Sequence, residues 1–150
     1  MSNKNRNKYW PYWALVLFIA MAAVWHANAK AETAIWAGAW SKHLITNDDY
    51  TSSHDLVAAE HKSVLAARYR NSYGRESYAI GYGANTSYGD LRLSGYIGAT
   101  TGYTKCWGND DSSGNVCPMF VGAAHYTRYS VQPGLLLFGE ALALTVRFEL

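Results

Sequence analysis

The chain has 150 residues, a formal net charge of +2, and 16% charged against 49% hydrophobic residues. This length fits a single domain, and the near-neutral charge excludes the strongly basic surface that nucleic-acid binding requires. Abundant Tyr, Trp and Gly, with only three Pro, favour β-strands whose two faces meet different surroundings.

Residues 1–29 have the order of a secretory signal peptide. They contain a basic head with Lys4, Arg6 and Lys8, an apolar run over 14–24, and the small-x-small pattern Ala27-Asn28-Ala29. The apolar run is well short of the roughly 20 residues that a membrane-spanning helix needs. We therefore expect residues 1–29 to be cleaved after export and residues 30–150 to form one mature domain.

Cleavage would change the charge balance of the protein. The leader carries three of the 13 basic residues and none of the 11 acidic ones, so the net charge would fall from +2 to −1. No basic patch would remain, and we expect no nucleic-acid partner.

Alternation of apolar and polar residues predicts eight strands in the mature domain. The last is the clearest, because Leu, Val and Phe alternate with Ala, Thr, Arg and Glu along 141–150. Ten residues is also the length of a tilted strand that crosses a membrane. The predicted strands are 34–45, 53–61, 64–71, 76–87, 90–103, 118–127, 130–138 and 140–150. Alternation is poor in 53–61 and 130–138, and Pro133 with Gly134 interrupts the latter.

The connections between these strands alternate in length. Short ones at 61–63, 87–90 and 127–129 alternate with longer, polar ones at 46–52, 71–75 and 105–116. Barrels of the outer membrane have short turns at one end and long external loops at the other. The sequence therefore predicts an all-β protein, an eight-stranded antiparallel transmembrane β-barrel of the outer membrane. We expect a monomer that needs the barrel assembly machinery for insertion, since Phe148 near the chain end resembles that assembly signal.

We assign the bulky face of each strand to lipid and the smaller or charged face to the lumen. In the first and third strands this places Trp36, Trp40, Leu65, Ala67 and Tyr69 outside. Over all strands, the same assignment places four arginines inside, namely Arg68, Arg70, Arg92 and Arg147. We expect Glu149 and Glu60 as their partners. Since eight strands leave an interior that side chains fill, we expect these charges to form a salt-bridge network within the barrel.

Cys106 and Cys117 both lie in the longest predicted loop. In an exported protein, two such cysteines predict a disulfide. Closing so short a loop would stabilise the fold by about 3 kcal/mol on the chain-entropy model. No Cys or His pair has the spacing of metal ligands, so we predict no metal site.

One segment resembles a known family. Arg70-Asn71-Ser72-Tyr73-Gly74-Arg75, followed by Ile80-Gly81-Tyr82-Gly83, is similar to the lipid A palmitoyltransferase (PagP) family of outer-membrane barrels. That family has a charged-Asp-Ser-aromatic segment and, at the same spacing, an Ala-Gly-Tyr-Gly stretch. The resemblance extends from about Trp36 to Leu150, where Arg147-Phe148-Glu149-Leu150 is similar to the family's Arg-Phe-x-Phe end.

The resemblance implies site residues by position. The family's catalytic Ser corresponds to Ser72, the Asp before it to Asn71, and its catalytic His to His43. The glycine that forms the floor of its acyl-chain pocket corresponds to Gly83. Asn71 lacks the carboxylate of the family's Asp, and the mature domain begins without the family's N-terminal amphipathic helix.

The residues themselves are compatible with this site and leave other interpretations open. Alternation places His43 and Ser72 at the external rim, and a nucleophile with its base must lie within hydrogen-bond reach. Residues 71–74 also have an ordinary tight-turn composition, and His43 could be an interfacial histidine. Arg70 and Arg75 could bind lipid phosphates at the rim.

Two functions follow as hypotheses. The first is an acyltransferase that moves a fatty acyl chain from a phospholipid to lipid A, without a metal or nucleotide cofactor, so its partners are lipopolysaccharide and phospholipid. It requires an apolar lumen that opens at the rim and extends past Gly83. The alternative is a non-catalytic outer-membrane barrel that alters or shields the cell surface through its external loops, with the lumen filled by Arg and Tyr. A soluble lipocalin-like binder is disfavoured, because its long apolar faces would lie in water.

Overall fold

The computed structural model describes residues 33–44, 52–103, 106, 116–139 and 141–150. The predicted signal peptide lies outside these residues. No helix in the described part of the chain is both long and apolar enough to span a membrane.

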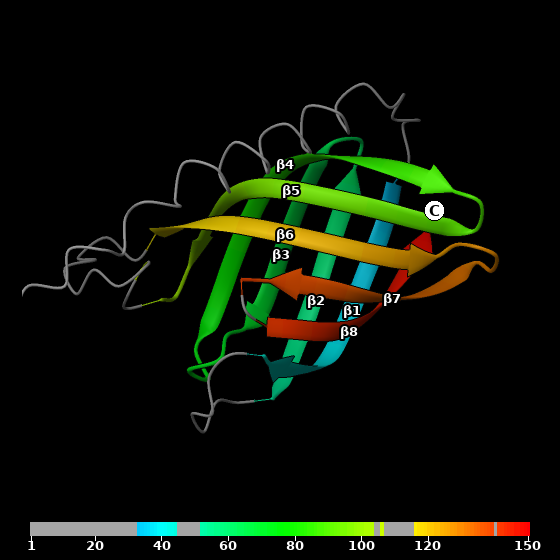
Figure 1. Cartoon of the computed structure of the whole chain (residues 1–150). Coiled ribbons are helices and arrows are strands. Elements are labelled where there is room, and N and C mark those ends of the chain that lie inside the picture. The colour runs from blue at the N-terminus through cyan, green and yellow to red at the C-terminus, as the bar shows by residue number, and fades with distance from the viewer. Residues whose placement is uncertain (1–32, 45–51, 104–105, 107–115, 140) are drawn as a thin grey trace, which may run out of the picture.

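Eight antiparallel strands form a closed barrel, as the sequence predicts (Figure 1). The strands are β1 (Thr33–His43), β2 (Ser53–His61), β3 (Val64–Arg70), β4 (Glu76–Tyr88), β5 (Leu91–Thr101), β6 (Val116–Tyr126), β7 (Val131–Phe138) and β8 (Ala141–Glu149). Each strand pairs with the next, and β8 closes the barrel by pairing with β1. The weakly alternating β2 and β7 are each held by a paired strand on both sides.

The barrel has two different ends. We call the end where β1, β3, β5 and β7 finish the loop rim, and the opposite end, which carries the C-terminus, the turn rim. At the turn rim, two-residue turns join β2 to β3 and β4 to β5, with φ of 56° at Lys62 and 58° at Gly89. Positive φ in two-residue hairpin turns matches the twist of the flanking strands.

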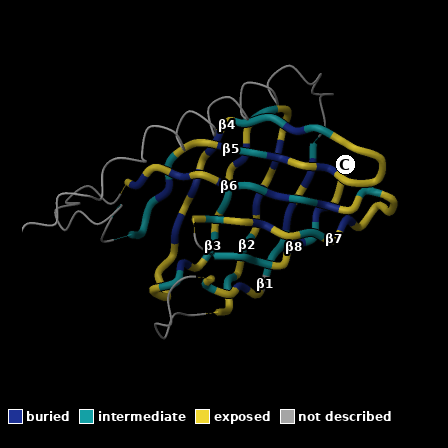
Figure 2. Tube along the Cα trace, in the orientation of Figure 1, coloured by how far each residue is buried: buried dark blue, intermediate teal, exposed yellow. Residues whose placement is uncertain are grey.

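Exposed and buried residues alternate along most strands, as Figure 2 shows. In β4, β5 and β8 the predicted division into an outer and an inner face is confirmed, with Arg92 and Arg147 in the lumen. The exterior is lined with apolar and aromatic side chains, including Ile35, Val57, Val64, Ile80, Tyr82, Leu93, Ile97, Phe120, Leu135, Leu137, Leu144 and Phe148.

The prediction for β1 was half wrong. Trp36 is completely buried and faces the lumen, whereas Trp40 is 50% exposed and faces outward. The pairing register of β1 shifts between Gly38 and Trp40 with respect to both of its neighbours. Such a bulge adds one residue and so reverses the alternation, which brings Ser41 and His43 to the inner face.

The prediction for β3 was wrong along the whole strand. Leu65 is buried, and Leu65, Ala67 and Tyr69 line the barrel interior. Arg68 and Arg70 point outward instead of into the lumen. Their partners are also outside, so the arginines avoid the cost of burial among apolar side chains. The pairs are Arg68 with Glu76 at 2.9 Å and Arg70 with Asp55 at 3.7 Å.

Candidate functional site

The loop rim brings Ser72 and His43 together. His43 is the last residue of β1, and Ser72 lies in the connection between β3 and β4. Ser72 Oγ and His43 Nε2 are 2.9 Å apart and share a hydrogen bond. The pairing of β1 with β2 and of β2 with β3 brings these two residues, 29 positions apart, to the distance that a nucleophile and its base require.

The connection that carries Ser72 is held by the buried side chain of Asn71. Its Oδ1 accepts hydrogen bonds from the backbone N–H groups of Tyr73 and Arg75, both at 3.0 Å. Its Nδ2 donates to Ser77 Oγ at 3.0 Å and to the Gly102 carbonyl at 2.8 Å. An aspartate would set a carboxylate oxygen against that carbonyl, so this geometry requires an amide. Asn71 thus has a positioning role in this structure.

Gly102 completes this support and was not identified from the sequence. Its φ is +86°, and a Cβ added there would lie 2.3 Å from Ser77 Oγ and 2.7 Å from the Glu76 carbonyl oxygen. Only glycine fits both the backbone conformation and the space. The end of β5 therefore fixes the conformation of the connection that carries the serine.

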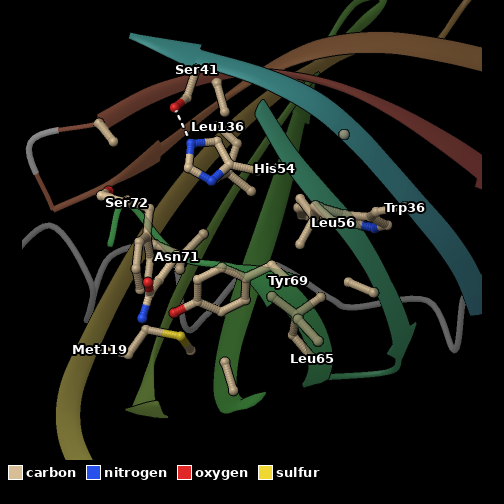
Figure 3. A pocket seen from close by; sticks show the side chains of 18 of the residues that line it. Trp36, Ser41, His54, Leu56, Leu65, Tyr69, Asn71, Ser72, Met119 and Leu136 are labelled. Atoms are coloured by element: carbon tan, nitrogen blue, oxygen red, sulfur yellow. Dashed lines mark hydrogen bonds between the residues drawn. The ribbon is translucent and has the colours of Figure 1, made fainter. Parts of the chain in front are cut away.

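An apolar cavity lies inside the barrel next to this pair (Figure 3). Its volume is about 80 Å³, and its mouth is open. Its walls are mostly apolar and include Leu56, Leu65, Ala67, Val121, Leu136, Phe138 and Ala143. Ser41, His54, Asn71 and Ser72 supply polar side chains in its lining. An apolar space with a few converging polar groups is the usual form of a ligand pocket.

Trp36 and Met119 line this cavity, but Gly83 does not. Gly83 faces the lumen as expected, at a position where an added Cβ would lie 2.7 Å from the Tyr96 ring and 1.9 Å from the Gly95 carbonyl oxygen. The ring of Tyr96 packs edge-on against Trp36, with centroids 6.0 Å apart. The Tyr96 ring therefore occupies the space next to Gly83, where the family resemblance implied the floor of an acyl-chain pocket.

A buried charge network fills the lumen on the other side of Trp36. Glu60 Oε1 accepts hydrogen bonds from Arg92 Nη2 and from the Tyr96 hydroxyl, both at 2.8 Å. Glu60 Oε2 accepts from Trp36 Nε1 and Arg147 Nε, both at 3.0 Å. The predicted network is confirmed for Arg92 and Arg147, and its partner Glu60 is completely buried.

This network extends from Glu60 towards the turn rim. Arg147 Nη1 donates to Gln132 Oε1 at 2.7 Å and also pairs with Glu149 at 3.2 Å. The predicted partner Glu149 is therefore confirmed as well. The lumen is apolar near the loop rim and polar near the turn rim, and Trp36 contacts both parts.

A second pocket lies at the loop rim itself. Its volume is about 230 Å³, and its lining includes His43, Ser72, Tyr73, Tyr103, Pro118, Phe120, Phe138 and the bonded pair Cys106 and Cys117. Ser72 lines both this rim pocket and the apolar cavity. Burial, with Tyr69 close by, raises the pKa of the Tyr103 phenol, so this hydroxyl stays protonated.

The predicted disulfide between Cys106 and Cys117 is confirmed, with Cα atoms 5.4 Å apart. It joins the chain just beyond β5 to the start of β6. The β6–β7 ladder begins only at the pair Val121 and Phe138. The segment 116–120 is therefore paired on its β5 side alone within the described strands.

The predicted anion-binding residues lie outside the cavity. Arg70 projects from the exterior at the loop rim, where it pairs with Asp55. Arg75 is exposed in the connection between β3 and β4. Neither residue lines the apolar cavity or the rim pocket, so both face the surroundings of the barrel.

Sequence reasoning also missed His54, which lies in the cavity lining and contacts Ser41. Among the described residues, no group of three or more His, Cys, Asp or Glu side chains could hold a metal ion. Comparison of the chain with protein-family models, curated proteins and solved structures finds no match.

Proposed function

We propose that the protein is an outer-membrane enzyme that transfers a fatty acyl chain from a phospholipid to lipid A. The observation that carries this proposal is the position of the Ser72–His43 pair. Its serine lies where an apolar cavity meets the rim pocket. An acyl ester needs these three surroundings: an apolar space for the chain, a reactive pair at the ester, and room for a polar head group.

The exterior supports a location in a membrane. Exposed Ile, Leu, Val, Phe and Tyr side chains cover the barrel wall, and water would meet a large apolar surface if the protein were soluble. The exposed ion pairs of β3 lie towards the loop rim, where a strand would leave the hydrocarbon layer. The disulfide suits a compartment outside the cytosol, as does the predicted signal peptide.

The proposed reaction uses the pair as nucleophile and base. His43 accepts the proton of Ser72 Oγ while this oxygen attacks the phospholipid ester carbonyl. The ester bond breaks, and the lysophospholipid leaves with the proton from His43. A lipid A hydroxyl then gives its proton to His43 and attacks the acyl-serine, and His43 returns this proton to the released Ser72 Oγ. No cofactor takes part in these steps.

The cavity sets an upper limit on the acyl chain. Trp36 and Met119 lie in its lining, and the charge network of Glu60 fills the lumen beyond Trp36. The chain can therefore extend only through the apolar part of the lumen. Residues 116–120 of β6 lack a β7 partner among the described strands, and a lipid would reach the rim pocket from the bilayer past this segment.

The filled part of the lumen is the observation that favours the alternative, a non-catalytic barrel that shields the cell surface through its external loops. Arg92, Arg147 and Tyr96 do occupy that region, as this alternative requires. The non-catalytic alternative does not account for the open apolar cavity near the loop rim.

The test is transfer by the purified barrel in detergent, with a phospholipid carrying deuterated acyl chains and with lipid A as acceptor. Mass spectrometry should show lipid A heavier by one deuterated chain. Ser72→Ala should abolish this product, and the exposed Ser87→Ala near the turn rim should not. Absence of the product with the unmodified protein, or its persistence in Ser72→Ala, would remove the assignment.

A further inference from the structure

A second serine–histidine contact lies in the lining of the same cavity (Figure 3). Ser41 Oγ and His54 Nε2 are 2.5 Å apart, and His54 Nδ1 lies 2.5 Å from the backbone carbonyl oxygen of Arg70. This contact joins three strands, because Ser41 belongs to β1, His54 to β2 and Arg70 to β3.

The carbonyl determines the roles of the two ring nitrogens. A carbonyl oxygen can only accept a hydrogen bond, so Nδ1 of His54 must donate to it. In the neutral ring, Nε2 is then the nitrogen without a proton, and it accepts the hydrogen bond from Ser41 Oγ. A serine bonded to the basic nitrogen of a histidine, whose other nitrogen is oriented by a third group, is the arrangement of an activated nucleophile.

The surrounding strands hold this arrangement in place. The β2–β3 ladder ends at the pair Val57 and Arg68, so the His54 ring takes the place of a strand partner for the Arg70 carbonyl. On the outer face, Asp55 pairs with the Arg70 side chain at 3.7 Å. Ser41 is held through its backbone N–H, which donates to the Ser52 carbonyl at 2.9 Å.

We propose that Ser41 and His54 form a nucleophilic site that hydrolyses acyl esters whose chain lies in the apolar cavity. Ser41 and His54 are the catalytic residues, and the Arg70 carbonyl is a positioning group. This proposal shares one assumption with the proposed function, namely that an acyl chain occupies the apolar cavity, and it rests on the proposed function in that respect alone.

The reaction consumes one ester and one water molecule. His54 Nε2 takes the proton of Ser41 Oγ as this oxygen attacks the ester carbonyl, and the alcohol leaves with that proton. Water then gives a proton to His54 and attacks the acyl-serine. The fatty acid leaves, and the proton returns to Ser41 Oγ.

The arrangement has a position suited to this chemistry. Ser41 is only 2% exposed, yet it lines a cavity with an open mouth, as does His54. Apolar neighbours such as Leu56, Leu136 and Ala143 line the same space and would hold a hydrocarbon chain. An acyl ester in this space would place its carbonyl among the polar side chains of the lining.

A structural role for His54, as a bridge between strands, can be separated from catalysis. Ser41→Ala leaves the His54–Arg70 contact intact, so the barrel should keep its stability while losing the nucleophile. We would treat the purified barrel in detergent with a long-chain alkyl fluorophosphonate, which forms a stable adduct with activated serines, and locate the adduct by peptide mass spectrometry. Hydrolysis of a long-chain nitrophenyl ester would be measured in parallel.

The proposal predicts an adduct on Ser41 and loss of hydrolysis to background in Ser41→Ala. His54→Gln should lower hydrolysis by about 100-fold or more, in line with the contribution of a general base. Ser87→Ala, at an exposed serine near the turn rim, should keep both the adduct and the hydrolysis. No adduct on Ser41, or undiminished hydrolysis in Ser41→Ala, would overturn the proposal.

The same variants separate this site from the proposed transfer. An adduct on Ser41 without acylation of lipid A supports the hydrolytic site and removes the transferase assignment. Acylation of lipid A that depends on Ser72, without an adduct on Ser41, supports the transferase assignment and removes the hydrolytic site.

Discussion

At the loop rim, the position of Ser72 depends on the residues that hold the connection between β3 and β4. Gly102 and Ser77 belong to this support, together with the amide of Asn71. Their effect on chemistry would be indirect, through the placement of the serine. Substitution of the glycine is therefore a test of positioning.

Gly102→Ala should lower acyl transfer by about tenfold or more, since 1.4 kcal/mol is a factor of ten and positive φ alone costs a side chain about 1–2 kcal/mol. The added Cβ would also lie 2.3 Å from Ser77 Oγ, so the connection must shift. Gly89→Ala is the matched control, because Gly89 has a φ of +58° with nothing within 4 Å of the added Cβ. The measurement is the initial rate of acyl transfer by Gly102→Ala and by Gly89→Ala. Equal rates would contradict the positioning role of Gly102.

The candidate site was only partly predictable at this scale. The resemblance pointed to Ser72 and His43, and the structure brings these two side chains into contact. His54 could not be found, because its contacts depend on how β1, β2 and β3 pair. The same holds for Gly102, whose importance arises from a close approach to a residue 25 positions earlier in the chain.

At the scale of the elements, the eight strands were predictable because a period of two is visible along most of them. The faces of β1 and β3 were not, for a physical reason. We assigned bulky residues to lipid, but the cavity wall itself requires Trp36, Leu65 and Tyr69. The bulge in β1 then reverses the alternation within one strand, which period alone cannot show.

The two faces of β7 allow a direct test of the cavity. Leu136 is 8% exposed and lines the cavity, whereas the adjacent Leu137 is 43% exposed and faces outward. Leu136→Trp should fill the cavity and shift transfer towards shorter acyl chains, while Leu137→Trp should leave the chain preference unchanged. The measurement is the length of the chain added to lipid A from a phospholipid mixture. Identical preferences in the two variants would show that the chain does not occupy this cavity.

At the scale of the whole molecule, the lumen is divided between an apolar space and a charged network, with Trp36 between them. The buried carboxylate of Glu60 is compensated by two arginines and two further donors. Removing one partner of a buried ion pair leaves a charge without compensation. This network should therefore dominate the stability of the barrel near the turn rim.

Arg92→Ala should lower the free energy of unfolding by about 3–5 kcal/mol, the usual cost of breaking a buried pair. Arg68→Ala is the matched control. The Arg68–Glu76 distance of 2.9 Å is close to the 2.8 Å between Arg92 and Glu60, but the Arg68–Glu76 pair is exposed. That substitution should leave the unfolding midpoint unchanged, because water compensates exposed charges. Urea unfolding in detergent, followed by tryptophan fluorescence, measures both. A similar loss in the two variants would contradict the role of the buried network.

Spin labels on adjacent residues of β8 test most directly the proposal that the barrel wall faces hydrocarbon while the interior holds the reactive groups. In reconstituted vesicles, a label at Leu144, which is 53% exposed, should collide readily with oxygen and rarely with a water-soluble nickel complex. A label at Thr145, which is 3% exposed and faces the lumen, should be protected from both. High accessibility of the Leu144 label to the nickel complex would place this wall in water and contradict the account.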